Sequence, residues 1–161
     1  MQLWRLVAHH DCPEEFIKHY CKKGVIALGW GRIGEILATN FTNWKDISKA
    51  ISEVYKDEHL NNSGAGGRSL WGLYKEMREG DLVILSNRER RKKVMQVITE
   101  EYFYENKRDH LLDTHDDYQH QRKACVKDYD PDELWEAALN MHPPNWNIRW
   151  PLFLCAKKFS L

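Results

Sequence analysis

Trp30 stands between Gly29 and Gly31, at the end of the apolar run from Val25 to Leu28. Glycine has no Cβ and permits backbone courses that other residues resist, so flanking glycines let a planar group approach the indole face. Stacking on an aromatic side chain contributes about 1–3 kcal/mol per base in nucleic-acid-binding proteins. The pattern favours a site for a flat ligand; the alternative is an indole packed in the core beside a structural turn.

A glycine-rich segment, 61–67, follows farther along the chain, and the sequence predicts an irregular loop there that opens a helix near Ser69. Free backbone N–H groups at a helix N-terminus attract anions. No Gly-Lys-Ser/Thr follows, which excludes a phosphate loop of the NTPase type. We expect this loop to form a second wall of the pocket, with Arg68 on a phosphate; the alternative is a flexible connector. Trp71 and Tyr74 are expected to add an aromatic wall, the alternative being that these rings pack onto the sheet.

The run Arg88–Lys93 holds five basic residues and one acidic residue, and it falls between two predicted strands. A basic hairpin tip is suited to contacts with the nucleic-acid backbone. A merely solvated run of charge is the alternative.

Histidines and cysteines do not form a common metal-binding pattern. His9 and Cys12 precede a predicted helix, whereas His19 and Cys21 lie on different faces of it. A nuclease centre made of Asp81 and Glu100 with Lys92 or Lys93 is the catalytic alternative, but an aspartate directly after a glycine is also common in turns. We therefore expect no metal, no cofactor and no enzymatic activity.

Composition bounds the class of protein. The chain has 161 residues, 42% of them hydrophobic, and 24 basic residues balance 24 acidic ones. This length fits one domain, and the zero formal charge argues against coating nucleic acid by bulk charge. Four cysteines are spread singly, the N-terminus has the pattern of a strand rather than of a signal peptide, and no apolar run approaches about 20 residues. We expect reduced thiols, no membrane association and a cytoplasmic location.

The spacing of apolar residues predicts the elements that position these candidates. Predicted strands cover 3–8, 25–28, 81–85, 94–99 (with 101–105 continuing it or starting the next), 118–127 and 152–155. Helices are predicted after Pro13, after the cap Asn43, near Ser69 and after Asp130, with a polar loop over 106–117 and breaks at Pro143, Pro144 and Pro151. The helical spacing places Trp44 in the core-facing stripe of the second helix. Helices come first and adjacent strands follow, which is an α+β arrangement: one domain, 1–161, with a curved mixed β-sheet or small barrel and flanking helices.

Two motifs, IxxGWGxxG from Ile26 and MxxGDxV from Met77, stand in order with the glycine-rich segment, the strand ending at Tyr104 and an HxR strand at His120. This combination resembles the PUA-like superfamily, in particular its EVE and YTH-like branch. It looks most like the N-terminal specificity domains of McrBC-type, modification-dependent restriction systems. The similarity covers residues 3–128, and residues 129–161 have no counterpart in it.

The resemblance implies a curved sheet of five or six strands and a pocket that takes one flipped, methylated base into an aromatic cage. The expected base pocket comprises Trp30, Gly31, Ser63, Gly64, Ser69, Trp71, Tyr102 and Tyr104, with the inward-facing tyrosine left open. The expected contacts to the nucleic-acid backbone are Arg32, Arg68, Arg88, Arg90, Arg91, Lys92 and Lys93. Arg122, in the HxR strand, is open to a structural role.

The function expected from the resemblance is recognition of a modified base in DNA, in restriction or phage defence. Extruding a base costs a few kcal/mol, which two aromatic faces can offset. A motor or nuclease would then belong to another chain or to a longer natural protein. An RNA reader of the same fold, an enzyme that cleaves or modifies bases, and a protein-interaction domain remain as alternatives.

Overall fold

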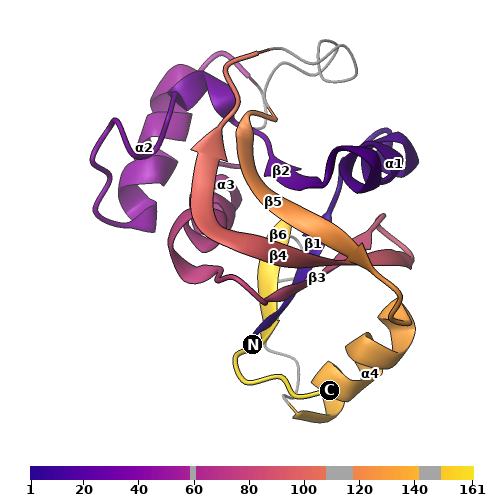
Figure 1. Cartoon of the computed structure of the whole chain (residues 1–161). Coiled ribbons are helices and arrows are strands. Elements are labelled where there is room, and N and C mark those ends of the chain that lie inside the picture. Colours follow the sequence, from indigo (N-terminus) through magenta and orange to yellow (C-terminus); the bar gives the residue numbers. More distant parts are fainter. Residues whose placement is uncertain (59–60, 108–117, 142–149) are drawn as a thin grey trace.

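The computed structural model describes residues 1–58, 61–107, 118–141 and 150–161 (Figure 1). Most of the predicted polar loop (108–117) and the predicted breaks at Pro143 and Pro144 lie outside these residues. The elements are, in order, β1 (Leu3–Val7), α1 (Pro13–Lys23), β2 (Val25–Leu28), the 3-10 turn η1 (Gly31–Ile33), α2 (Trp44–Val54), α3 (Ser63–Trp71), the π-helical turn η2 (Gly72–Glu76), β3 (Leu82–Ser86), β4 (Arg91–Tyr104), β5 (His120–Lys127), α4 (Pro131–Met141) and β6 (Leu152–Ala156).

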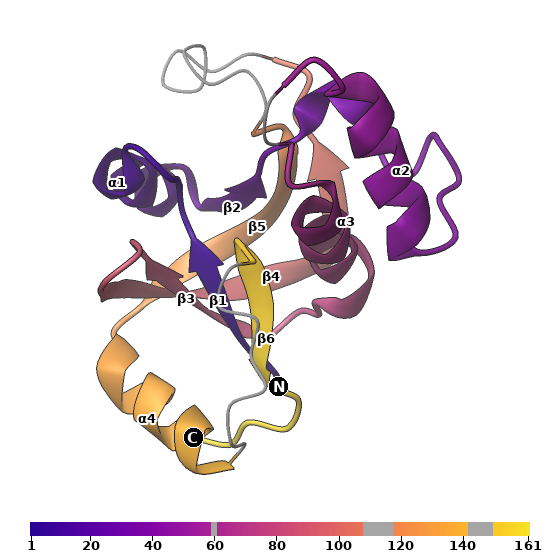
Figure 2. The ribbon, with the colours of Figure 1, turned by 180° about the vertical axis from the view of Figure 1, so that it is seen from behind.

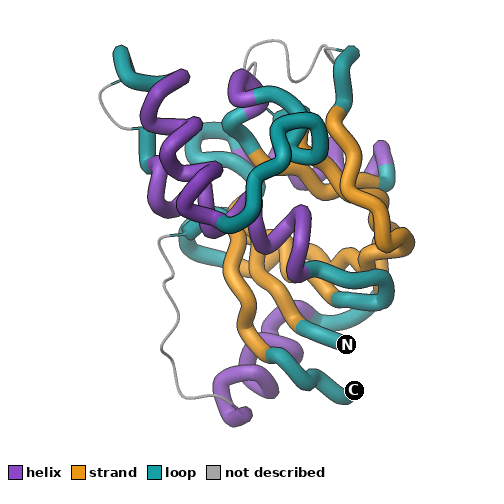
Figure 3. Tube along the Cα trace, turned by 90° about the vertical axis from the view of Figure 1, so that its left-hand side faces the viewer, coloured by secondary structure: helices purple, strands orange, loops and turns teal. Residues whose placement is uncertain are grey.

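The strands form one mixed sheet in the order β2-β5-β4-β3-β1-β6. β1 and β3 run parallel, and the other neighbouring pairs are antiparallel. The tube view shows a curved sheet, with α2 and α3 towards one end and α4 at the other (Figure 3). The α+β arrangement with a mixed sheet is confirmed.

The central strands are buried on both faces, as the continuous apolar run in β3 predicts. On one face, Trp4 and Val83 pack with residues of α1, α2 and α3. On the other face, Leu3 and Leu82 pack with residues of α4, such as Leu134. The sheet therefore separates two apolar layers, and α1, α2 and α3 share the larger one.

Local signals set the helix starts as expected. Pro13 begins α1, and Gly24 ends it with a left-handed φ of 67°. Asn43 caps α2 through its side chain and forms a capping box with Asp46. Asp130 accepts hydrogen bonds from the first backbone N–H groups of α4. These caps fix the direction in which each helix leaves the sheet.

The prediction of an irregular loop over 61–67 is wrong, because α3 begins at Ser63 and contains both Gly66 and Gly67. Glycine is a poor helix former, but here close packing overrides propensity. A Cβ on Gly66 would lie 2.7 Å from Ile51 Cδ1, and one on Gly67 would lie 2.0 Å from Ser48 Oγ. The glycines let α3 lie directly against α2 and the Trp30 turn. Seen from behind, α3 is next to β6 (Figure 2).

β4 continues through both segments that the sequence left as one strand or two, with a sharp irregularity in the middle. Val97 pairs with Ala124 and Tyr102 pairs with Arg122, so four residues of β4 lie opposite one residue of β5. Such a bulge leaves backbone groups without partners and bends the strand. The Arg122 guanidinium donates to the carbonyls of Thr99 and Glu100 in this bulge, and to those of Leu73 and Tyr74 in η2.

Candidate functional site

Trp30 follows β2 after one residue, Gly29, and has a left-handed backbone, with φ 64° and ψ 32°. A bulky residue in this region is a genuine outlier that costs of order 1–3 kcal/mol, and such outliers gather at functional sites. The indole is half-buried. The turn thus holds a large planar side chain at the surface in a conformation that glycine would adopt without strain.

Two side chains from the sheet hold the backbone of this turn. His120 Nε2 lies 3.1 Å from the Trp30 carbonyl oxygen, and the Tyr104 hydroxyl donates to the Gly31 carbonyl at 2.7 Å. The other ring nitrogen of His120, Nδ1, lies 2.6 Å from the Tyr102 hydroxyl. Because a carbonyl can only accept, Nε2 carries the proton, and Tyr102 donates to Nδ1.

Burial keeps this group of side chains neutral. Desolvation lowers the pKa of His120 to about 4, against the smaller raising effect of its hydrogen bond to Trp30. Desolvation also raises the pKa of Tyr102 well above its usual value. At neutral pH His120 is therefore an uncharged imidazole with one donor and one acceptor, as the two hydrogen bonds require.

The edge of the indole faces α3. Trp30 Nε1 donates to the Asn61 carbonyl at 3.0 Å, and a Cβ on Gly66 would lie 2.8 Å from Trp30 Cε2. The glycine that makes room for the indole is therefore Gly66, in α3. The expected role of Gly29 and Gly31, to let a flat ligand approach the indole, stays a prediction. Neither of those two has a positive φ, and Gly31 is instead bound through its carbonyl.

Gly66→Ala is expected to displace the Trp30 indole and to lower the free energy of unfolding by about 1–3 kcal/mol, because the added methyl group overlaps Trp30 and Ile51. The indole Nε1–H resonance of Trp30 should move as its bond to Asn61 is lost. Gly64→Ala is the matched control: a Cβ there meets nothing within 4 Å, so it should stabilise α3 by up to about 1 kcal/mol. Equal behaviour of the two variants would contradict this role of Gly66.

Both predicted tyrosines of β4 face the same side, because they are two residues apart on a strand. Tyr102 is buried and Tyr104 is half-buried. An edge-to-face series continues outward from Tyr102 to Tyr74 at 5.4 Å and from Tyr74 to Trp71 at 6.0 Å. The structure thus joins Trp71 to the His120 and Trp30 region through intervening rings.

The remaining predicted pocket residues lie on α3 in different settings. Ser63 is half-buried, and its backbone N–H donates to the Asn61 side chain. Gly64 is exposed. Ser69 is fully buried, and its hydroxyl donates to the Leu152 carbonyl at 3.3 Å, which ties α3 to β6. Ser69 therefore faces β6.

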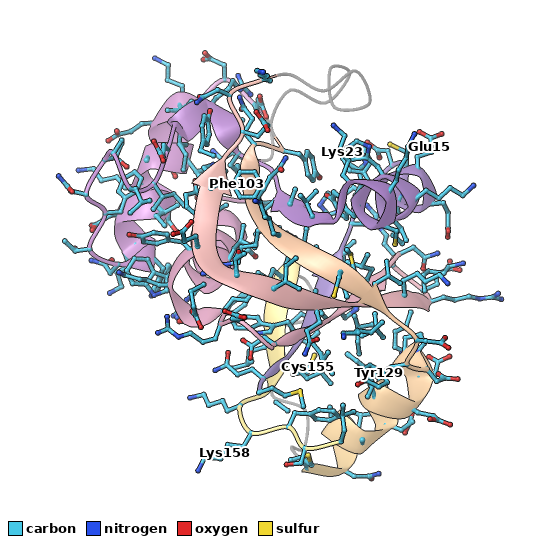
Figure 4. The ribbon with its side chains drawn as sticks, viewed as in Figure 1. Glu15, Lys23, Phe103, Tyr129, Cys155 and Lys158 are labelled. Atoms are coloured by element: carbon cyan, nitrogen blue, oxygen red, sulfur yellow. The ribbon has the colours of Figure 1, made fainter. Side chains whose placement is uncertain are left out.

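The structure places the basic run apart from Trp30. Arg91–Lys93 begin β4, and Tyr104 ends the same strand. In the turn before β4, the Asn87 side chain accepts hydrogen bonds from the backbone N–H groups of Glu89 and Arg90. Figure 4 labels Phe103 at this far end of β4, near α2. Arg88, Arg90 and Lys93 are exposed, but Arg91 pairs with Asp132 and Lys92 pairs with Glu14.

Arg32 follows the Trp30 turn and is also engaged. Its guanidinium lies 3.9 Å from the centroid of the Tyr55 ring and forms an ion pair with Glu58. Its backbone N–H donates to the Tyr55 hydroxyl oxygen at 3.1 Å. Arg32 links the turn to the end of α2.

The alternative nuclease centre does not assemble. Asp81 is buried, and its carboxylate accepts from the backbone of Gln2 and Arg78 and from Trp4 Nε1. Glu100 lies at the surface, next to Arg78. In the described ranges no group of three or more histidine, cysteine, aspartate or glutamate residues is arranged to hold a metal ion. His9 was considered as a metal ligand, but its Nδ1 accepts hydrogen bonds from the backbone N–H groups of Asp11 and Cys12.

Sequence reasoning gave no role to His120 and no individual role to Gly66. His120 and Arg122 are two residues apart on one strand, so their side chains lie on the same face of the sheet. Both are buried in β5, where His120 orients Trp30 and Arg122 fills the bend of β4. No local pattern pointed to Gly66, because its role comes from a contact with Trp30, distant in sequence.

Comparison with known proteins gives one match. Residues 4–127 match the family described as "Domain of unknown function (DUF8426)". The chain belongs to this family. Neither a curated protein nor a solved structure matches it. The family match takes in the Trp30 turn, α3 and the β4–β5 pair, and it ends before α4 and β6, although β6 pairs with β1 in the same sheet. No helix in the described part of the DUF8426 chain is long and apolar enough to cross a membrane.

Proposed function

We propose that this chain is a PUA-like module of the EVE and YTH-like kind that binds DNA without catalysis and recognises a methylated base flipped against Trp30. The observation that carries the proposal is the Trp30 turn. A half-exposed indole sits in a left-handed conformation, and side chains of two strands hold the adjoining carbonyls. A site whose backbone strain is balanced by fixed partners is pre-organised for a ligand.

The chemistry of the surrounding residues supports a planar, uncharged ligand. The Trp30 turn is held by neutral groups, the Tyr104 hydroxyl and the His120 imidazole. Trp71 and Tyr74 add aromatic surface from α3 and η2. A base presents a flat face to such rings, and stacking contributes about 1–3 kcal/mol per base.

The resemblance supports a role in modification-dependent restriction or phage defence, with any motor or nuclease on another chain. The placement of Asp81 supports binding rather than hydrolysis, since its oxygens are occupied by Gln2, Trp4 and Arg78. The zero formal charge fits a reader that depends more on its pocket than on phosphates.

The test measures binding of fluorescent duplexes of one sequence that are unmodified, methylated at cytosine or methylated at adenine, together with RNA of that sequence. A buried methyl group contributes about 0.8 kcal/mol, so we expect at least one methylated duplex to bind about fourfold more tightly than the plain duplex. Trp30→Gly removes the indole and suits the left-handed backbone, so the fold should persist while the preference is lost.

Trp30→Phe is the matched control, because it keeps an aromatic face and should keep part of the preference. Equal binding of all the duplexes by the natural chain would overturn the proposal, as would an unchanged preference in Trp30→Gly. Tighter binding of the RNA would favour the RNA reader of the same fold.

A further inference from the structure

The surface arginines and lysines of this neutral chain differ in whether they form an ion pair with a carboxylate. Several are matched with carboxylates: Arg32 with Glu58, Arg78 with Glu100, Arg91 with Asp132, and Lys92 with Glu14. Arg68, exposed on α3, is different. Within the described ranges it has no carboxylate partner, and its guanidinium lies instead over an indole.

The indole belongs to Trp44, the first residue of α2, which the sequence placed in a core stripe but which is half-buried. Arg68 Cζ lies 3.8 Å from the Trp44 ring centroid and 5.7 Å from that of Trp150. Lys45 Nζ lies 5.9 Å from the same Trp44 ring. Two cations and two indoles thus share one surface, here called the Trp44–Arg68 surface and made of Trp44, Lys45, Arg68 and Trp150.

Close contact between the helices builds this surface. A Cβ on Gly67 would lie 2.6 Å from the Trp44 carbonyl, so only glycine lets α3 approach α2 closely enough to bring Arg68 over Trp44. The nearest acid in sequence, Asp46, is turned into the capping box, where it accepts from Thr42 and Asn43. A guanidinium holds its N–H donors in its own plane as a rigid fork, which is the geometry that phosphate recognition uses.

We propose that the Trp44–Arg68 surface binds single-stranded DNA, with Arg68 and Lys45 on successive phosphates and an unpaired base on an indole. The inference rests on the proposed function, because extruding a base beside Trp30 exposes unpaired strand nearby. Gly66 faces Trp30 and Arg68 faces Trp44, so the two indoles lie on different sides of α3. A helix is about 10–12 Å across, which is about three nucleotide rises of 3.4 Å, so one strand can reach both.

The experiment titrates the chain with a fluorescent oligothymidine of about 12 nucleotides, within the site sizes known for single-strand binders, over a series of salt concentrations. This probe has no modified base and does not depend on the pocket at Trp30. For the double variant Lys45→Ala/Arg68→Ala we expect a loss of affinity of about tenfold or more, and a salt slope smaller by about 1.4. Arg68→Lys should keep the salt slope and still lose affinity, because an ammonium group is not a planar fork.

Lys22→Ala on α1 is the control for loss of a surface cation elsewhere on the molecule. Lys22 is exposed, and α1, where Glu15 and Lys23 are labelled in Figure 4, lies on the opposite side of the molecule from α2 (Figures 1 and 4). It should bind as the natural chain does. Unchanged affinity in the double variant, or an equal loss in Lys22→Ala, would overturn the inference. Loss in the double variant together with no preference for methylated duplex would sustain this surface while rejecting the methylated-base proposal.

Discussion

Arg122→Met is expected to lower the free energy of unfolding by about 3–5 kcal/mol, the largest effect of any single change considered. The guanidinium is buried and donates to four carbonyls: Leu73 at 2.5 Å, Tyr74 at 3.0 Å, Glu100 at 2.9 Å and Thr99 at 3.2 Å. Methionine fills similar space but donates nothing, so carbonyls from η2 and from the bulge of β4 would be left without partners. Each orphaned buried acceptor costs about 1–3 kcal/mol, part of which water entering the bend would recover.

Urea unfolding measures this loss, with two variants for comparison. Arg122→Lys keeps the charge but not the fork that reaches both elements, so we expect an intermediate loss. Arg78→Ala removes an exposed arginine whose guanidinium lies 3.9 Å from Glu100, and its effect should stay within about 0.5 kcal/mol. A loss below 1 kcal/mol for Arg122→Met would show that the bend is held by other contacts.

Signals that act within one turn of chain predicted their elements well. Pro13 and Asn43 mark the starts of α1 and α2 because capping involves neighbouring backbone groups. The unbroken apolar run of β3 marks a strand that is covered on both faces. In each case the residues that decide the structure lie next to one another in the sequence.

Features that depend on distant contacts were not predictable in this way. The glycines of α3 resemble those of a loop until Trp30, Ile51 and Ser48 show why no Cβ fits there. The length of β4 likewise decides that the basic turn lies far from Tyr104, and a run of charges carries no information about that distance.

The sequence singled out Trp30 but not the contacts that hold its turn. Trp30 stood out because a large ring between two glycines is unusual, and the structure gives it a rare backbone conformation. The reason for its orientation lies in His120 and Tyr104, which approach it from β5 and β4. Trp44, assigned to the core by its helical spacing, is half-buried because Arg68 covers it instead of the sheet.

Acid is expected to weaken the fold through His120. Its pKa in the folded chain is about 4, against the usual 6.5, because burial disfavours the charged ring. Between these values the unfolded chain binds a proton that the folded chain does not, so unfolding is favoured as the pH falls from 6.5 to 4. The difference corresponds to about 3 kcal/mol lost over this window, whereas above it the stability no longer changes through the titration of His120.

The structural reason is that a doubly protonated ring cannot accept from Tyr102. Both nitrogens would donate, so the Tyr102 hydroxyl would have to turn away while Nε2 remained on the Trp30 carbonyl. His120→Gln supplies one donor and one acceptor and does not titrate in this range. We expect it to be less stable than the natural chain at pH 7, and to lose less stability on acidification.

Unfolding free energies of both proteins at intervals from pH 7 to 4 give the comparison, because acidic groups such as Asp46, whose pKa is lowered by hydrogen bonds from Thr42, contribute equally to each. Parallel pH profiles would show that His120 is not the group responsible. Convergence of the two profiles towards pH 4 would identify the hydrogen bonds from Tyr102 to His120 and from His120 to Trp30 as the acid-sensitive support of the turn.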